Sequence, residues 1–283
     1  MRRYAMTIAY DGTGFHGWQK QHPPDSDPLR TVQEVVEAAV QEVVREPVHV
    51  LGASRTDSGV HAEGQVASFL SPREFNPEIL PAAITSRLPD DVQVKSAWET
   101  DPAFNPIGDA VSKGYRYRIA HARNTADLRP LFDRHVTAWS PNHLDLEAMK
   151  EAAAHLVGEH DFAAFTRVRQ TRESTVRTIF DCTVEAEDDD RLAIHVSGNG
   201  FLWNMVRIVA GTLVGVGEAR YKPEDIPDMI ASGDRQRTGR TMPPEGLCLM
   251  WIEYGEPGSG RARQKQATAD AAIADQSENG PSE

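Results

Sequence analysis

The sequence predicts an α+β protein built from two ferredoxin-like β-α-β-β-α-β halves whose antiparallel sheets join around a central cleft. Two observations support this fold class. Strand-like alternation, helix-like periodicity and turn residues follow one another in the order β-α-β-β-α-β through the first part of the chain, and the same order returns in the second part. Because that order is typical of ferredoxin-like units, the chain is expected to contain an internal structural duplication.

The first half is expected to span residues 1–105. Its helix starts are indicated by Thr31, a candidate N-cap before an apolar periodic run, and by Asn76 followed by Pro77, a capping residue with proline at the first helical position. The predicted elements are a strand at 3–10, a helix at 31–45, strands at 47–53 and 63–70, a helix at 76–87 and a strand at 91–98.

The second half is expected to span residues 106–255, with a long loop at 121–142 and an additional helix at 223–232. The acidic run at 185–190 is expected to form a hairpin tip. Residues 256–283 are rich in small and polar residues without periodicity, so a disordered tail is expected there. The other predicted elements are a strand at 111–120, a helix at 144–157, strands at 177–185 and 191–197, a helix at 203–217 and a strand at 247–254.

Composition limits the classes of partner. The chain has 283 residues, 40% of them hydrophobic, enough for one or two cores, and its net charge of -12 argues against binding nucleic acid through bulk positive charge. Any polyanion must therefore be met by local arginine clusters, although each cluster could equally be a solvated face. The clusters are Arg116, Arg118, Arg123, Arg129 and Arg134; Arg167, Arg169, Arg172 and Arg177; and Arg235, Arg237 and Arg240.

No window reaches the roughly 18 apolar residues that a membrane span needs, and no signal-peptide region precedes the first strand. A cytoplasmic protein without membrane association is therefore expected. The two cysteines, Cys182 and Cys248, lack the spacing of a zinc site or a disulfide framework, and the ten histidines form no metal constellation. Both cysteines are expected to be buried strand residues, and no metal is expected.

The most informative segment runs from Gly52 to Ala62 and contains Arg55-Thr56-Asp57-Ser58-Gly59-Val60-His61. It places one carboxylate, Asp57, beside an arginine and a glycine turn, directly after a strand-like run. Asp57 should therefore sit on a loop presented by a rigid element, where a carboxylate can act as a nucleophile or base. The alternative is that Asp57 only supports the turn through a bond from its side chain to the backbone.

Two further segments combine aromatic residues with glycine or arginine. Residues 10–19 hold three glycines and three aromatic residues, among them Trp18, which suits either base stacking or a glycine-rich turn with a core tryptophan. Along the strand at 111–120, Tyr115 alternates with Arg116, so tyrosines face one side and arginines the other. The tyrosines could stack on bases or simply fill the core.

Arg207 lies in a strongly apolar helix, after the segment Gly198-Asn199-Gly200-Phe201-Leu202-Trp203-Asn204-Met205-Val206. A charge in such surroundings must be paired or must reach water, so a carboxylate partner is expected. That pairing could serve a catalytic site, or it could only lock the two halves together. No serine or cysteine motif suggests a nucleophilic triad.

Four motifs, in this order and spacing, resemble the tRNA pseudouridine synthase A family: Tyr-Asp-Gly with Gly-Trp-Gln at 10–19, Arg-Thr-Asp-x-Gly-Val-His-Ala at 55–62, Tyr-Arg-Tyr at 115–117 and Met-Val-Arg at 205–207. The resemblance covers nearly the whole chain up to Tyr254. It implies the pseudouridine synthase fold with a central catalytic cleft. It also implies a homodimeric enzyme, without cofactor or metal, that isomerises uridine to pseudouridine at positions 38, 39 and 40 in the tRNA anticodon stem-loop.

The resemblance also implies roles for particular residues. Asp57 would attack C1′ or remove the C2′ proton, two routes that the sequence leaves open, and Arg207 would pair with it and keep it ionised. Tyr115 would stack on the target uracil, and Arg55 would fill the gap left by the extruded uridine. Further substrate-binding residues implied by the motifs are Arg116, Trp18 and His61.

One position departs from the family pattern. Relatives commonly have an arginine before the Tyr-Arg-Tyr strand where this chain has Ile107, which puts one expected contact in doubt. The alternative function is a non-catalytic RNA-binding protein on the same scaffold. An acid-base enzyme for a small polar substrate is a more distant alternative, because a second carboxylate paired with Asp57 is missing from the motif.

Overall fold

One long sheet organises the chain in the computed structural model, which describes residues 1–21, 29–124, 127, 129–167 and 174–255. Its ten strands include a continuous path in the order β4-β1-β3-β10-β5-β9-β8-β7, while β2 pairs with β3 and β6 with β5. The strands are β1 (Arg2–Tyr10), β2 (Leu51–Gly52), β3 (His61–Ser71), β4 (Val92–Thr100), β5 (Ala110–His121), β6 (Ala138–Ser140), β7 (Gly158–Asp161), β8 (Val176–Ala186), β9 (Arg191–Gly198) and β10 (Leu247–Tyr254).

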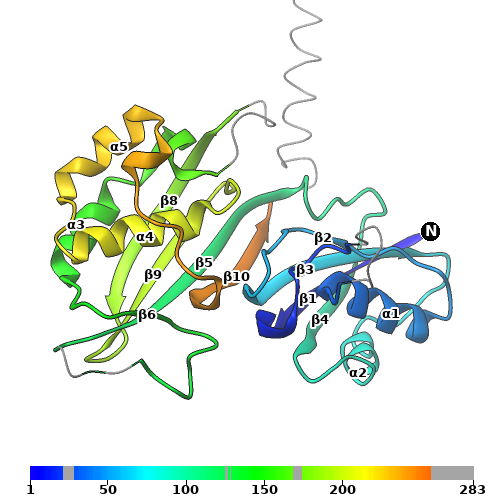
Figure 1. The fold of residues 1–283 in the computed structure, drawn as a ribbon. Coiled ribbons are helices and arrows are strands. Elements are labelled where there is room, and N and C mark those ends of the chain that lie inside the picture. Colours follow the sequence, from blue (N-terminus) through cyan, green and yellow to red (C-terminus); the bar gives the residue numbers. More distant parts are fainter. Residues whose placement is uncertain (22–28, 125–126, 128, 168–173, 256–283) are drawn as a thin grey trace, which may run out of the picture.

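The helices form two groups beside this sheet. Figure 1 shows α1 and α2 beside β1, β3 and β4, and α3, α4 and α5 beside β5, β8 and β9. The α-helices are α1 (Val32–Val44), α2 (Leu80–Thr85), α3 (Leu146–Ala154), α4 (Met205–Gly217) and α5 (Ile226–Ser232). The short 3₁₀ turns are η1 (Gly12–Gly14), η2 (Ala163–Phe165), η3 (Pro223–Asp225), η4 (Arg235–Arg237) and η5 (Pro244–Gly246).

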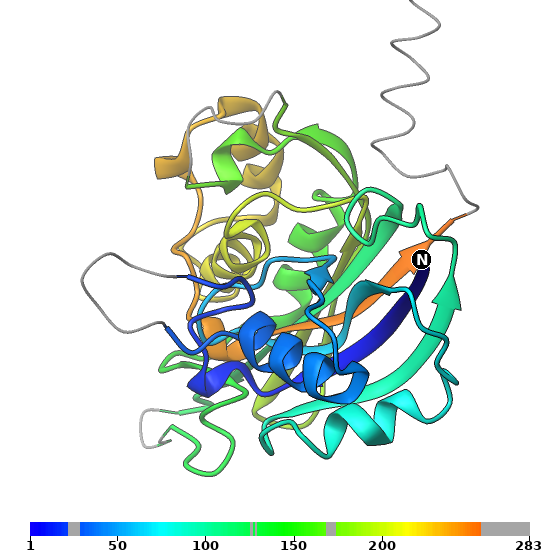
Figure 2. The same cartoon turned by 90° about the vertical axis from the view of Figure 1, so that its right-hand side faces the viewer.

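Strand β10 joins the two groups of strands. It pairs in parallel with β3 through Cys248↔His61 and Leu249↔Ala62, and antiparallel with β5 over seven residue pairs. Seen from the side of α1 and α2, β10 runs through the middle of the molecule, where it pairs with β3 (Figure 2). The sheet is therefore mixed rather than purely antiparallel, and its centre is built by the last strand of the described chain.

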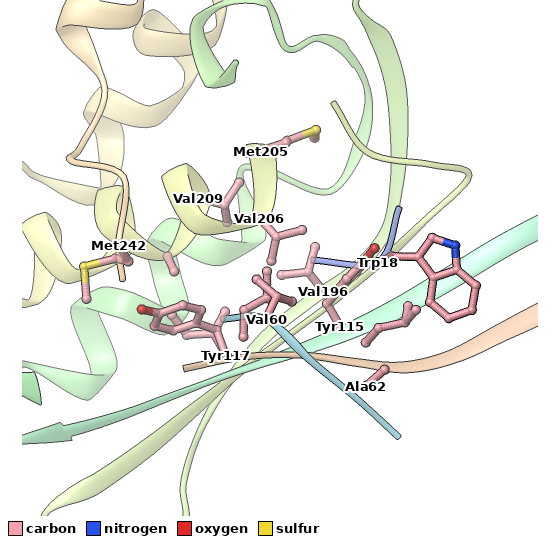
Figure 3. Packing of buried hydrophobic residues seen from close by; sticks show 14 of the residues in the cluster. Trp18, Val60, Ala62, Tyr115, Tyr117, Val196, Met205, Val206, Val209 and Met242 are labelled. Atoms are coloured by element: carbon pink, nitrogen blue, oxygen red, sulfur yellow. The ribbon is translucent and has the colours of Figure 1, made fainter. Parts of the chain in front are cut away.

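The buried hydrophobic residues form one cluster that extends along the sheet and includes α4. Of the 13 residues of α4, all but Arg207 are buried, which follows from an apolar sequence on every face of the helix. Figure 3 shows Val206 of α4 gathered with Val60, Tyr115 and Val196. Among the described residues, none of the helices combines the length and the apolar character that crossing a bilayer requires.

Most predicted elements are present with ends that differ by a few residues, but two predictions are wrong in extent. The strand predicted at 47–53 is only β2, because side chains of α1 satisfy the preceding backbone: Glu37 accepts from the Val50 N–H at 2.8 Å, and Gln33 donates to the Val50 carbonyl at 2.9 Å. The helix predicted at 76–87 begins only at Leu80. The Asn76 side chain accepts a hydrogen bond from the Glu78 N–H, and this bond forms a turn before the helix instead of its first turn.

Two short strands were not predicted. β6 lies inside the segment expected to be a long loop, and β7 follows α3 and pairs with β8. Residues 187–190 of the acidic run do form the β8–β9 hairpin connection, where Asp188 and Asp190 pair with Arg191, and the run begins in the last two residues of β8. The tail expected at 256–283 lies outside the described residues.

Candidate active site

A cleft of about 740 Å³ lies between the two halves of the sheet and holds Asp57. Most of its lining comes from the loop between β2 and β3, strand β5 with the residues before it, and the segment that leads from β9 into α4, and β8 and β10 add one residue each. Its polar and charged lining residues include Ser54, Arg55, Asp57, Lys113, Tyr115, Arg177, Asn199, Trp203, Asn204 and Arg207, and its apolar lining includes Val60, Leu202, Met205, Val206 and Leu247.

The glycine-rich segment after β1 holds the Asp57 loop in place. The Trp18 N–H donates to the Thr56 carbonyl at 3.1 Å, and the Gly59 N–H donates to the Phe15 carbonyl at 3.2 Å. Gly17 has φ of +89°, and a Cβ there would lie 2.7 Å from the Thr56 oxygen, so only glycine allows this approach. The glycine-rich motif at 10–19 therefore supports the motif at 55–62, which carries Asp57.

Asp57 receives one hydrogen bond on each carboxylate oxygen. The Trp203 indole Nε1 donates to Oδ1 at 3.0 Å, and Arg207 Nη1 lies 3.4 Å from Oδ2. The Asp57 side chain is 31% exposed and the Arg207 side chain 16%. The carboxylate is thus held from two sides and still open to the cleft.

Arg207 is itself fixed by neighbours. Its Nε donates to the Met242 carbonyl at 2.7 Å, and its Nη1 donates to Asn204 Oδ1 at 2.8 Å. Asn204 precedes α4 with φ of 61°. The partner expected from the apolar surroundings of Arg207 is therefore Asp57, on the loop between β2 and β3.

Tyr115 forms part of the cleft wall. Its ring packs edge-on against Phe201 with centroids 5.2 Å apart, and its hydroxyl lies 3.0 Å from Ser54 Oγ. Burial raises the pKa of Tyr115 to about 12, against a smaller opposing effect of the Ser54 bond, and the charge of Asp57 raises it as well. The side chain is therefore a neutral phenol at neutral pH.

The structure brings four of the predicted site residues together: Asp57, Arg207, Tyr115 and Arg55, which is exposed at the cleft. Trp18, predicted to bind substrate, is a core residue instead, because it is only 2% exposed and fills the space over Gly52.

His61 and Arg116 are also outside this cleft. Strand alternation places Arg116 on the face of β5 opposite Tyr115, and both residues line a separate hollow of about 330 Å³. His61 is buried, with Nδ1 accepting the Gly12 N–H at 3.0 Å. Neither side chain lines the cleft that holds Asp57.

Three residues of the site were not predicted. Trp203 and Asn204 lie in the segment already noted before Arg207, and their polar groups beside a charged residue were the available signal. Ser54 gave no signal, because only the fold brings its hydroxyl to Tyr115.

The charge of the cleft differs from that of the whole chain. Its lining contains four basic side chains, Arg55, Lys113, Arg177 and Arg207, and one acidic side chain, Asp57. A single carboxylate in a locally basic, partly apolar cleft suits an anionic substrate whose reacting group is uncharged. In the part of the chain that the structure describes, no group of three or more His, Cys, Asp or Glu side chains could hold a metal ion.

The fold and the cleft thus define an α+β protein that presents one oriented carboxylate in a locally basic cleft. The family model described as tRNA pseudouridine synthase matches residues 6–105 and 152–255. The chain belongs to the tRNA pseudouridine synthase family.

Curated relatives match across their whole length. The chain is 41% identical to tRNA pseudouridine synthase A of Geotalea uraniireducens and to that of Caldicellulosiruptor saccharolyticus, each over 254 residues covering 90% of this chain and 100% of the relative. It is also 41% identical to tRNA pseudouridine synthase A 2 of Clostridium perfringens over 255 residues, with the same coverage.

Similarity to solved structures is weak. An H/ACA RNP bound to a substrate RNA containing 2′-deoxyuridine matches with a TM-score of 0.32 and 12% identity, covering 73% of this chain and 44% of that one. A Cbf5-Nop10-Gar1 complex matches with the same TM-score and identity, covering 87% of this chain and 58% of that one. Scores this low support no statement about the present chain.

Proposed function

We propose that this chain isomerises uridine to pseudouridine in tRNA, and that its targets are positions 38, 39 and 40 of the anticodon stem-loop. The observation that carries the proposal is the Asp57 carboxylate, held by Trp203 and Arg207 in a basic cleft of a member of this family. The reaction breaks the N1–C1′ bond, turns the uracil, joins C5 to C1′, and moves a proton from C5 to N1 in net terms. No oxidation or hydrolysis is needed.

Asp57 can start this reaction in two ways. It can attack C1′ and form a glycosyl ester, or it can remove the C2′ proton and release uracil from a glycal. Both routes use an oxygen of this carboxylate, and Arg207 at 3.4 Å and the Trp203 N–H at 3.0 Å hold those oxygens in place. Each oxygen accepts a single hydrogen bond from the described residues, so a lone pair on either oxygen is available to the substrate.

The remaining cleft residues suit an extruded nucleotide. Tyr115 would stack on the uracil, and because it lines the same cleft as Asp57, a base stacked on it would lie near the carboxylate. As a phenol of raised pKa, Tyr115 is a poor base, so its hydroxyl, bonded to Ser54, would only relay the C5 proton to solvent, while N1 takes up one proton in exchange. Arg55, exposed at the rim, would occupy the gap in the stem and offset an unstacking cost of a few kcal/mol.

The finer architecture is also a proposal. We infer that residues 1–105 and 106–255 are two ferredoxin-like halves, the first carrying Asp57 and the second carrying Tyr115 and Arg207. The supporting facts are the strand orders β4-β1-β3-β2 and β10-β5-β9-β8, which correspond strand for strand. The candidate active site would then contain residues from both halves.

We further propose a homodimer in the cytoplasm. The exposed apolar side chains Leu131 and Phe132, at 64% and 95% exposure, would suit burial against a second copy. The free buried cysteines Cys182 and Cys248 fit a reducing compartment, where tRNA is modified.

The proposed function is tested by tritium release from C5-labelled, unmodified tRNA with wild type, Asp57→Ala and a control, Asp189→Asn. Asp189 lies on the β8–β9 hairpin with its side chain 93% exposed. Wild type and control should release tritium, while Asp57→Ala should bind tRNA without release, because most affinity comes from phosphate contacts. Tight binding without release by wild type would instead show a non-catalytic RNA-binding protein.

A further inference from the structure

A second hollow, of about 480 Å³, lies beside the Asp57 cleft and is lined by Arg167, Arg207, Arg235 and Thr241. We call it the arginine hollow. Arg207 lines both spaces, so the two are adjacent at its side chain. Its Nη1 faces Asp57 and Asn204, and among the described residues Nη2 has no hydrogen-bond acceptor.

The segment after α5 is built to present Arg235 here. Arg235 donates from Nη1 to Thr238 Oγ1 at 2.9 Å and from Nη2 to Thr241 Oγ1 at 3.1 Å. The segment lies directly on α4, because a Cβ at Gly211 would be 1.8 Å from the Arg240 carbonyl oxygen. The Arg235 guanidinium is therefore oriented before any ligand arrives, which lowers the entropy cost of binding.

The charge of the arginine hollow is not balanced by the protein. Within the described residues, neither Arg167 nor Arg235 forms an ion pair with a carboxylate, and only Arg207 has one, Asp57. Burial lowers the pKa of Arg235, and the nearby charge of Arg167 lowers it further. The chain as a whole has 42 acidic and 30 basic residues, so an excess of positive charge at one place is unusual for it. Three guanidinium groups surround the arginine hollow, and in the described part of the chain Asp57 is the one carboxylate paired with any of them. The remaining positive charge can be balanced by an anion from outside the protein.

We propose that the arginine hollow binds a backbone phosphate of the tRNA next to the extruded uridine. A phosphate oxygen accepts from several guanidinium groups at once, and arginine is the side chain best suited to that geometry. The position beside Asp57 favours a phosphate of the reacting nucleotide or its neighbour over a free anion. The inference rests on the proposed tRNA substrate.

The test combines a protein variant with a modified RNA. Arg167→Gln is the main variant, because Arg167 is exposed and no hydrogen bond of it is described, so the fold should survive; Arg235→Lys is the second. Arg237→Gln is the matched control, an exposed arginine of the same 3₁₀ turn η4 that does not line the hollow. Each protein is titrated with stem-loop RNAs that carry one neutral methylphosphonate linkage at successive positions around the target.

Arg167→Gln should weaken binding about tenfold at 0.15 M salt and reduce the salt slope by about 1, while Arg237→Gln stays within about twofold. Neutralising one linkage should weaken RNA binding by the wild type by a similar factor and leave RNA binding by Arg167→Gln unchanged. This non-additivity is the coupling expected of partners in contact. Arg235→Lys should show the same coupling.

Wild-type affinity for Arg167→Gln, or losses that simply add at every linkage, would overturn the proposal. Turnover by wild type in the same tRNA separates the two hypotheses. Turnover without coupling would contradict the phosphate site but agree with the proposed function. Coupling without turnover would agree with the phosphate site but contradict the isomerase activity.

Discussion

Replacing Gly17 by alanine should disturb the catalytic loop from a distance. At φ of +89° an L side chain is strained by roughly 1–2 kcal/mol. Its Cβ would also lie 2.7 Å from the Thr56 oxygen, so the backbone next to Asp57 must shift by several tenths of an ångström. Because a misplacement of about 1 Å at a reacting group costs on the order of 100-fold, we expect kcat to fall about tenfold and the free energy of unfolding by about 2 kcal/mol.

The assay pairs urea denaturation with tritium release at saturating tRNA. Gly14→Ala is the matched control from the same glycine-rich segment, because the nearest atom to its added Cβ is Nη1 at the flexible end of Arg30, 2.9 Å away. That variant should change unfolding free energy by less than about 1 kcal/mol and leave kcat within about twofold. Equal kcat for Gly17→Ala and wild type would refute the view that this segment positions Asp57.

Three further predictions concern the cleft. Trp203→Phe keeps a ring but removes the hydrogen bond to Asp57, and it should lower kcat about three- to tenfold. A hydrogen bond to a charged group is worth about 1.5–3 kcal/mol when buried, and less when the donor is half exposed, as Trp203 is. Unchanged single-turnover rates would contradict this prediction. Between pH 10 and 12 the folded state should lose stability, because unfolded tyrosine ionises at its ordinary pKa of 10.0 while folded Tyr115 holds its proton to about 12. Urea denaturation of Tyr115→Phe should show a shallower fall, and parallel curves would count against the raised pKa. Ile107→Arg, at a half-exposed position in the cleft lining, should tighten tRNA binding and steepen its salt slope by about 1, whereas Ile107→Gln should not; equal slopes would place the RNA backbone elsewhere.

Local pattern was enough to predict most of the secondary structure. The two α-helices with long apolar faces, α1 and α4, and the alternating strand β5 lie where their patterns indicate. Local pattern failed where tertiary partners decide. The backbone around Val50 bonds to Glu37 and Gln33 of α1 instead of to a strand, and this depends on how α1 lies.

The site was predictable to the extent that its residues belong to motifs. Asp57, Arg207 and Tyr115 stand in three separate segments, and the fold brings them to one cleft. Trp18 is a motif residue whose role the sequence did not predict. A tryptophan among glycines suits base stacking and burial equally until the neighbours of its ring are known. Trp203 could have been noticed as a donor near Arg207, but its direction toward Asp57 depends on the packing of both halves.

The most direct test of the central claim is pseudouridine formation in anticodon stem-loop RNAs that each carry one uridine, at position 38, 39 or 40. Wild type or Asp57→Asn is mixed in excess with each RNA, and the nucleosides are separated and quantified over time. Wild type should convert uridine to pseudouridine, and Asp57→Asn should bind the same RNAs and form none. Pseudouridine formed by Asp57→Asn at the wild-type rate, or none formed by wild type on RNA that it binds, would contradict the assignment of Asp57 as the catalytic carboxylate of a tRNA uridine isomerase.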